Sequence, residues 1–167
     1  LHRVDRRQRQ MCIRDSYKTF NDKVVAYVAY GNDLLTSVKN IRPAMVVCSK
    51  AGSATDADAR ATVIKQCAES LGKVSDLPSS EFKTFVTDIK VAYEEYGKVY
   101  EQMAALKSPF GEQYEQYKTL STQMSAVSKK ISTIASTFSD ALKAHDDQVS
   151  VKDSADALAD YLNEQQK

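Results

Sequence analysis

Residues 79–145 read SSEFKTFVTDIKVAYEEYGKVYEQMAALKSPFGEQYEQYKTLSTQMSAVSKKISTIASTFSDALKAH, and apolar side chains recur in them at alternating steps of three and four. This spacing keeps apolar side chains on one face of a helix. The pattern is interrupted at residues 107–111, KSPFG, where proline and glycine favour a turn. We therefore predict two long helices that fold back on each other as a hairpin.

Both arms of this hairpin carry one continuous apolar stripe. The first arm places it at Phe82, Phe85, Val86, Ile89, Ala92, Tyr93, Tyr96, Val99, Tyr100, Met103 and Leu106. The second arm places it at Tyr117, Leu120, Met124, Val127, Ile131, Ile134, Phe138, Ala141 and His145. A stripe sustained over several turns is typical of helices that pack lengthwise against a partner. We expect the two stripes to face each other and to form the core.

A further helix is predicted over residues 17–40, ahead of the hairpin. Pro43 should end it, because proline lacks the amide that a helix interior needs. Its inward stripe is predicted at Tyr17, Phe20, Val24, Tyr27, Val28, Gly31, Leu34, Leu35, Val38 and Ile41. At Gly31 the missing side chain would let a neighbour approach closely. For residues 44–54, an irregular packed link and one more helical turn both stay open.

Two short helices complete the prediction. One begins at Thr55, whose hydroxyl can cap the free amides of a helix start, and ends at Gly72. Its inward residues are Ala57, Ala61, Ile64, Cys67, Ala68 and Leu71. Ser79 is predicted to cap the first helix of the hairpin. After a break at residues 146–148, the last helix turns inward Val151, Ala155, Leu158 and Leu162.

These elements amount to an all-α fold. Three long and two short helices would form an antiparallel bundle built on the hairpin of residues 79–145. No window of useful length alternates strictly between apolar and polar residues, so no strand competes. Gly97, inside the hairpin, costs about 1 kcal/mol relative to alanine and suggests a close helix crossing. We expect residues 17–167 to form a single domain.

The first sixteen residues, LHRVDRRQRQMCIRDS, differ from the rest of the chain in composition. They hold five of its seven arginines and no lysine. The run RRQRQMCIRDS resembles the conceptual translation of a sequencing-library adapter, which implies that residues 1–16 are a non-native, disordered leader. A basic arm for nucleic acid or an import signal is the alternative. If the leader is foreign, a native start with any secretory signal or lipid-accepting cysteine is missing.

The charge of residues 17–167 argues against a nucleic-acid partner. These residues carry 18 Lys and Arg against 20 Asp and Glu, a balance of −2 without clustered cations. The longest apolar run, residues 24–30, is much shorter than the roughly 20 residues of a membrane-spanning helix. We expect no nucleic acid and no transmembrane segment, whereas a protein partner, self-association and a lipid anchor in a missing start stay open.

Cys48 and Cys67 are the two cysteines outside the leader. An even pair in a small chain admits a disulfide and hence an oxidising compartment. Their spacing is not that of a redox-active dithiol, and two buried thiols are the alternative, because Cys67 lies on the apolar side of its helix. We favour a disulfide between Cys48 and Cys67.

His145 is the one histidine of residues 17–167, and it continues the apolar stripe at a helix end. His145 is a candidate for a metal or haem ligand, or for a capping or surface histidine. The Glu-x-x-His pairs of di-metal bundles are missing around it, so we favour the capping or surface role. A single histidine also leaves no nucleophile and base to pair. We therefore predict no enzyme activity, no catalytic or metal-binding residue and no cofactor.

Tyrosines are concentrated toward the turn of the hairpin. They are Tyr93, Tyr96, Tyr100, Tyr114 and Tyr117. Rings at one end of a bundle can pack while their hydroxyls reach water, so these residues are candidates for a partner or ligand surface. Core tyrosines at a bundle end are the simpler interpretation.

Three functional interpretations follow, since residues 17–167 resemble no family that we recognise. The leading one is a non-enzymatic helical-bundle protein of the bacterial cell envelope or secreted space, periplasmic or lipoprotein-like, with a structural or protein-interaction role. The second is a carrier bundle for a small ligand, haem or a metal. The third is an intracellular or phage coiled-coil scaffold. Bundle architecture alone does not choose among them.

Overall fold

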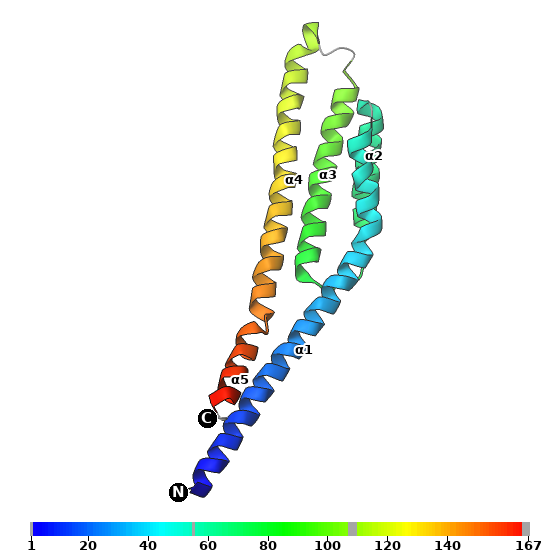
Figure 1. Ribbon diagram of the computed structural model, residues 1–167. Helices are drawn as coiled ribbons and strands as arrows, with labels where there is room; N and C mark the ends of the chain where they lie inside the picture. The colour runs from blue at the N-terminus through cyan, green and yellow to red at the C-terminus, as the bar shows by residue number, and fades with distance from the viewer. Residues whose placement is uncertain (1, 55, 107–109, 165–167) are drawn as a thin grey trace. The chain divides into compact units, whose positions relative to one another are not determined.

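The computed structural model describes residues 2–54, 56–106 and 110–164, and these form helices with short connections (Figure 1). The long helices are α1 (His2–Ser49), α3 (Ser80–Ala104) and α4 (Tyr114–Val149), and the short ones are α2 (Ala57–Gly72) and α5 (Lys152–Glu164). Two 3₁₀ turns, η1 (Lys50–Ser53) and η2 (Gly111–Gln113), follow α1 and precede α4. The predicted all-α bundle is confirmed, with α3 and α4 as its hairpin. Part of the predicted turn, residues 107–109, lies outside the described residues.

The chain divides into two compact units, and the single domain expected over residues 17–167 stays a prediction. The main unit is residues 33–141, and the end unit combines residues 1–32 with residues 142–167. The disulfide, the tyrosines of α3 and the two cavities considered below all belong to the main unit. The candidate functional features therefore lie in residues 33–141.

Neighbouring helices of the main unit run antiparallel. Between α3 and α4, the Phe82 ring contacts Phe138 at a centroid distance of 4.9 Å, and the Lys130 ammonium contacts Glu95 at 2.8 Å. Residue numbers thus rise along one helix as they fall along the other. The same holds between α2 and α3, where Arg60 is hydrogen-bonded to Tyr100 and Gly72 lies beside Lys90.

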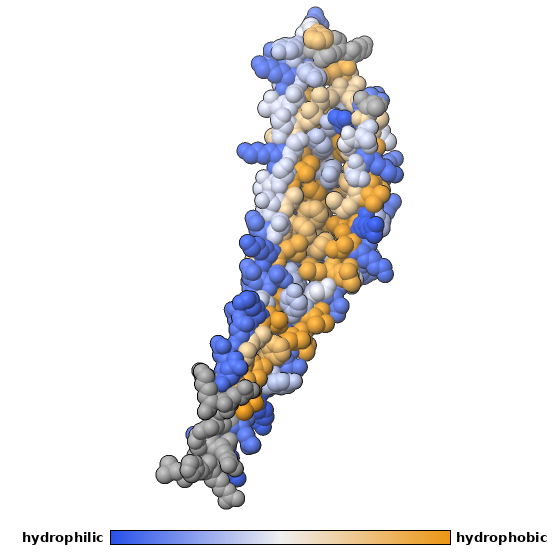
Figure 2. All heavy atoms as spheres, in the orientation of Figure 1, coloured by the Kyte–Doolittle hydropathy of each residue, from blue (hydrophilic) through white to orange (hydrophobic). Residues whose placement is uncertain are grey.

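The core of the main unit is centred on α2 and α3. Ile64, Cys67 and Ala92 are fully buried, and Leu71 is 1% exposed. The inward faces predicted for α2 and for the first arm of the hairpin are therefore confirmed. α4 is less buried than predicted: among its described residues Leu120 alone is buried, most of its stripe is half-buried, and Ala141 is exposed. In Figure 2, apolar residues gather along α4 while polar residues cover its outer side.

Pro43 does not end the first helix, contrary to the prediction. α1 continues through Pro43 to Ser49 and passes into η1, so residues 44–53 are helical. A proline inside a helix costs about 3 kcal/mol, because it removes the bond to the carbonyl of Lys39 and crowds it. Lys39 and Pro43 are both exposed, so water can reach that carbonyl, whereas Ala44 and Cys48 are buried and hold the helix in place.

The predicted inward stripe of α1 is right only in part. Ile41 is buried as predicted, and Phe20, Val24 and Leu34 are half-buried. Leu35 is 70% exposed and Val38 48% exposed, whereas Ser37, which was not in the stripe, is fully buried. Gly31 is exposed, and a Cβ added there would meet nothing within 4 Å, so it marks no close approach.

Polar groups explain the buried side of α1. The Ser37 hydroxyl, fully buried, accepts a hydrogen bond of 3.3 Å from the amide of Ser79, and the Asn40 side-chain amide donates to the carbonyl of Asp76 at 2.8 Å. Asp76 has a positive φ of 54° in the loop between α2 and α3. α1 therefore buries a face that satisfies this loop and leaves an apolar face uncovered.

The helix starts follow ordinary capping rules. Thr55, the predicted cap of α2, lies outside the described residues, and the cap that the structure shows is Asp56, whose carboxylate accepts from the amide of Ala59 at 2.7 Å. Ser79 caps α3 as predicted, accepting from the amide of Phe82 at 3.3 Å. Gly97 is buried against α2, where an added Cβ would lie 3.5 Å from Ile64, so the predicted close crossing is present.

In the end unit, α4 continues through the break predicted at residues 146–148 and stops at Val149. His145 is therefore not at the helix end. Its ring stacks on that of Tyr30 with centroids 4.1 Å apart. Leu162 of α5 is 45% exposed, so it does not turn inward as predicted. Residues 2–16 continue α1 as helix, which differs from the disorder expected of the leader.

Candidate functional site

A disulfide joins the end of α1 to α2. The Cys48 and Cys67 sulfurs are 2.01 Å apart, with Cα atoms at 4.6 Å, and both residues are buried. The predicted pairing is therefore present in the structure. Cys12, in the leader, is a free and exposed cysteine. The bridge encloses 19 positions of sequence and fixes the start of η1 beside α2.

Three of the five candidate tyrosines come together beside this bridge. Tyr93, Tyr96 and Tyr100 lie on successive turns of α3, and the rings of Tyr96 and Tyr100 meet edge to face with centroids 5.0 Å apart. Tyr100 is buried, and the hydroxyl of Ser128 on α4 donates to that of Tyr96 at 3.3 Å. Tyr114 and Tyr117 are exposed on α4, and they do not line the cavity that the other three tyrosines border.

Arg60 of α2 is the residue that the sequence analysis missed. Its Nη1 donates to the Tyr100 hydroxyl at 3.2 Å, its Nη2 donates to the carbonyl of Ala54 at 2.8 Å, and the guanidinium lies 5.6 Å from the Tyr100 ring centroid. Its Nε is buried and has no hydrogen-bond partner among the described residues. The sequence gives one signal for Arg60: arginine is rare in residues 17–167, where Arg42 and Arg60 are the two that occur.

These groups surround a cavity of about 330 Å³, which we call the Arg60 pocket. Its lining residues come from α1, η1, α2, α3 and α4 and are Cys48, Ala51, Gly52, Arg60, Ile64, Tyr93, Tyr96, Tyr100, Ser128 and Ile131. Ile64, Ala61 and Tyr100 form a buried cluster against which Tyr93, Tyr96 and Met124 pack. The pocket therefore lies beside this buried cluster.

The Arg60 pocket carries a positive charge that no acidic side chain among its described lining residues neutralises. The hydrogen bond to the Tyr100 hydroxyl raises the pKa of Arg60 further above its ordinary value, and burial raises the pKa of Tyr93 and of Tyr96. At neutral pH the guanidinium is charged and these two phenols are neutral. No Asp or Glu is among the described residues that line the pocket.

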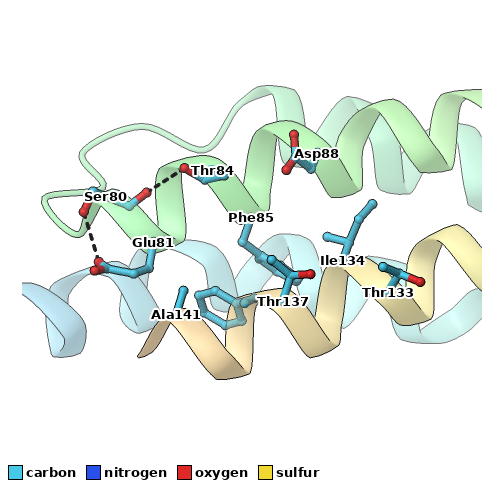
Figure 3. A pocket seen from close by; sticks show the side chains of 10 residues that line it. Ser80, Glu81, Thr84, Phe85, Asp88, Thr133, Ile134, Thr137 and Ala141 are labelled. Atoms are coloured by element: carbon cyan, nitrogen blue, oxygen red, sulfur yellow. Dashed lines mark hydrogen bonds between the residues drawn. The ribbon is translucent and has the colours of Figure 1, made fainter. Parts of the chain in front are cut away.

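A second cavity, the α3/α4 groove, lies between α3 and α4 and has a volume of about 270 Å³ (Figure 3). Phe85 stacks on Phe138 with centroids 4.5 Å apart and gives the groove an aromatic wall. The hydroxyl groups on its rim donate hydrogen bonds within α3: Thr84 donates to the carbonyl of Ser80 at 3.1 Å, and Ser80 donates to Glu81 at 3.2 Å. The groove accounts for the incomplete burial of Ile134 and Phe138 on the stripe of α4.

In the described part of the chain, the His, Cys, Asp and Glu side chains form no group of three or more that could hold a metal ion. None of the helices in this part combines the length and the apolar character needed to cross a membrane.

No protein-family model, curated protein or solved structure matches the chain. Its function is inferred from the disulfide, the surface of α1 and the two cavities.

Proposed function

We propose that this chain is a non-enzymatic helical-bundle protein of an oxidising, extracytoplasmic compartment, the bacterial cell envelope or secreted space, with a structural or protein-interaction role. The disulfide between Cys48 and Cys67 is the observation that supports this most directly, because disulfides persist mainly in oxidising compartments. The single histidine of residues 17–167 stacks on Tyr30 and adds no base for a nucleophile.

Thiol mapping in the cells that make the protein tests the compartment. Denaturing alkylation before reduction, followed by peptide mass spectrometry, should leave Cys48 and Cys67 unmodified, because these two sulfurs are bonded to each other. After reduction both cysteines should be modified. Alkylation of Cys48 and Cys67 before reduction would place the chain in a reducing compartment and contradict the proposal.

The interaction role rests on the uncovered face of α1. In the main unit Leu35, Val38, Met45 and Val46 of α1 are 37–70% exposed. Exposed apolar side chains at intervals of three and seven are typical of a helix that packs against another helix. The net charge of +1 sets up little repulsion between copies. We assign this face to pairing with a second copy of the chain.

Self-association should therefore depend on this face. Val38→Asp should raise the dissociation constant of the dimer on the order of tenfold or more, because pairing would desolvate an unpaired carboxylate. Val91→Asp, at a valine of α3 that is 42% exposed against 48% for Val38, is the matched control and should leave the constant unchanged. Sedimentation equilibrium measures it. A chain that stays monomeric throughout the concentration series, or equal effects of the two substitutions, would contradict pairing through α1.

A further inference from the structure

The Arg60 pocket has the features of a binding site for a small organic anion. We propose that it binds a monocarboxylate whose carboxylate pairs with Arg60 and whose apolar body lies beside the tyrosine rings of α3. This goes beyond the structural and interaction role and does not depend on it. The inference rests on the hydrogen bonds of Arg60, on its charge, and on the size and walls of the pocket.

The guanidinium of Arg60 has unused donors. Of its five N–H groups, the Nη1 bond to Tyr100 and the Nη2 bond to the Ala54 carbonyl account for two. The buried Nε has no acceptor among the described residues, and a buried donor without an acceptor costs free energy. A carboxylate that accepts from Nε and a neighbouring Nη in the usual two-bond geometry would satisfy it.

The charge of Arg60 is also unmatched within the described residues, because no acidic side chain is paired with it or lines the pocket. Glu95, on the same helix as the three tyrosines, is held by Lys130 at 2.8 Å. A half-buried cation without a counter-ion favours an anionic ligand. Arg60 is the one cationic residue among those lining the pocket, so a single negative charge balances it better than a doubly charged phosphate.

The walls select the rest of the ligand. Ile131 supplies aliphatic surface, and Tyr93 and Tyr96 supply ring edges and faces that favour contact with a flat apolar group. A volume of about 330 Å³ is at the lower end for small-molecule sites, which are roughly 300 to 1,000 Å³. An aromatic acid with a short side chain fits these limits.

Binding of phenylacetate to the full-length chain tests the proposal. The nine tyrosines can be labelled for NMR, and addition of phenylacetate should shift the ring signals of Tyr96 and Tyr100 while those of Tyr114 and Tyr117 stay in place. Phenylacetamide, which has the same ring without the charge, should bind on the order of tenfold more weakly or worse. Inorganic phosphate should not displace phenylacetate at equal concentration.

Two variants locate the effect at the guanidinium. Arg60→Gln should weaken phenylacetate binding on the order of tenfold or more, whereas Arg42→Gln, at an exposed arginine of α1 in the same unit, should leave it unchanged. The comparison of acid with amide uses the unaltered chain, so it holds even if Arg60→Gln disturbs the fold. Absence of phenylacetate binding, equal binding of acid and amide, displacement by phosphate, or equal effects of the two substitutions would overturn the proposal.

Discussion

Removal of the disulfide by Cys48→Ala together with Cys67→Ala should lower the free energy of unfolding by about 3 kcal/mol. The bridge closes a loop of 19 positions, and the chain-entropy account gives roughly this value for a loop of such length. Both cysteines are buried, so the alanines also leave small voids that add to the loss. Guanidinium titration followed by circular dichroism measures the change.

Two comparisons separate the bridge from other causes. Treatment of the unaltered chain with a thiol reductant should lower its stability by a similar amount, since the same cross-link is opened. Cys12→Ala should leave stability within about 0.5 kcal/mol, because Cys12 is free and exposed. If the double variant unfolded at the same denaturant concentration as the unaltered chain, the bridge would contribute nothing to the stability of the main unit.

Leu71→Ala should cost about 2 to 5 kcal/mol of unfolding free energy. Leu71 is 1% exposed in the last turn of α2, where the substitution removes buried apolar atoms and leaves a cavity that the packed helices fill only partly. The loss should appear as a lower denaturant midpoint with little change in slope, because the surface exposed on unfolding stays nearly the same.

The matched control makes the same substitution at an exposed position. Leu35 of α1 is 70% exposed, so Leu35→Ala should change stability by no more than about 0.5 kcal/mol when measured at concentrations where the chain is monomeric. The comparison cancels the intrinsic difference in helix propensity between leucine and alanine. Equal losses at the two positions would mean that α2 is not packed as the structure describes.

The hairpin of α3 and α4 was predictable because apolar periodicity and burial agree on α3. Phe82, Val86 and Ile89 are buried where the spacing placed them. On α1 the same reasoning placed Ile41 correctly but failed at Leu35 and Val38, because a fully buried hydroxyl, that of Ser37, lies on the inward side instead. Its partner lies 42 positions away, and local spacing has no access to that contact.

The candidate site was predictable only in part. Tyr93, Tyr96 and Tyr100 follow steps of three and four and so share a face of α3, which sequence spacing captures. Arg60 lies 40 positions from Tyr100, and its importance depends on the acceptors it lacks in three dimensions. The pairing of Cys48 with Cys67 was partly predictable. An even number of cysteines favours a disulfide, but only the three-dimensional structure shows that the two sulfurs are close enough to form it.

The turn that connects α2 to α3 is completed by groups from outside those two helices. Ser37 and Asn40 of α1 supply the acceptor for the Ser79 amide and the donor for the Asp76 carbonyl. In an excised fragment of α2 and α3, the Ser79 amide and the Asp76 carbonyl would lose these partners and hydrogen-bond to water instead. The left-handed backbone of Asp76 would then lack the hydrogen bond that stabilises it. These two helices are therefore not a module that can be transplanted into another scaffold without the hydrogen bonds that Ser37 and Asn40 of α1 provide.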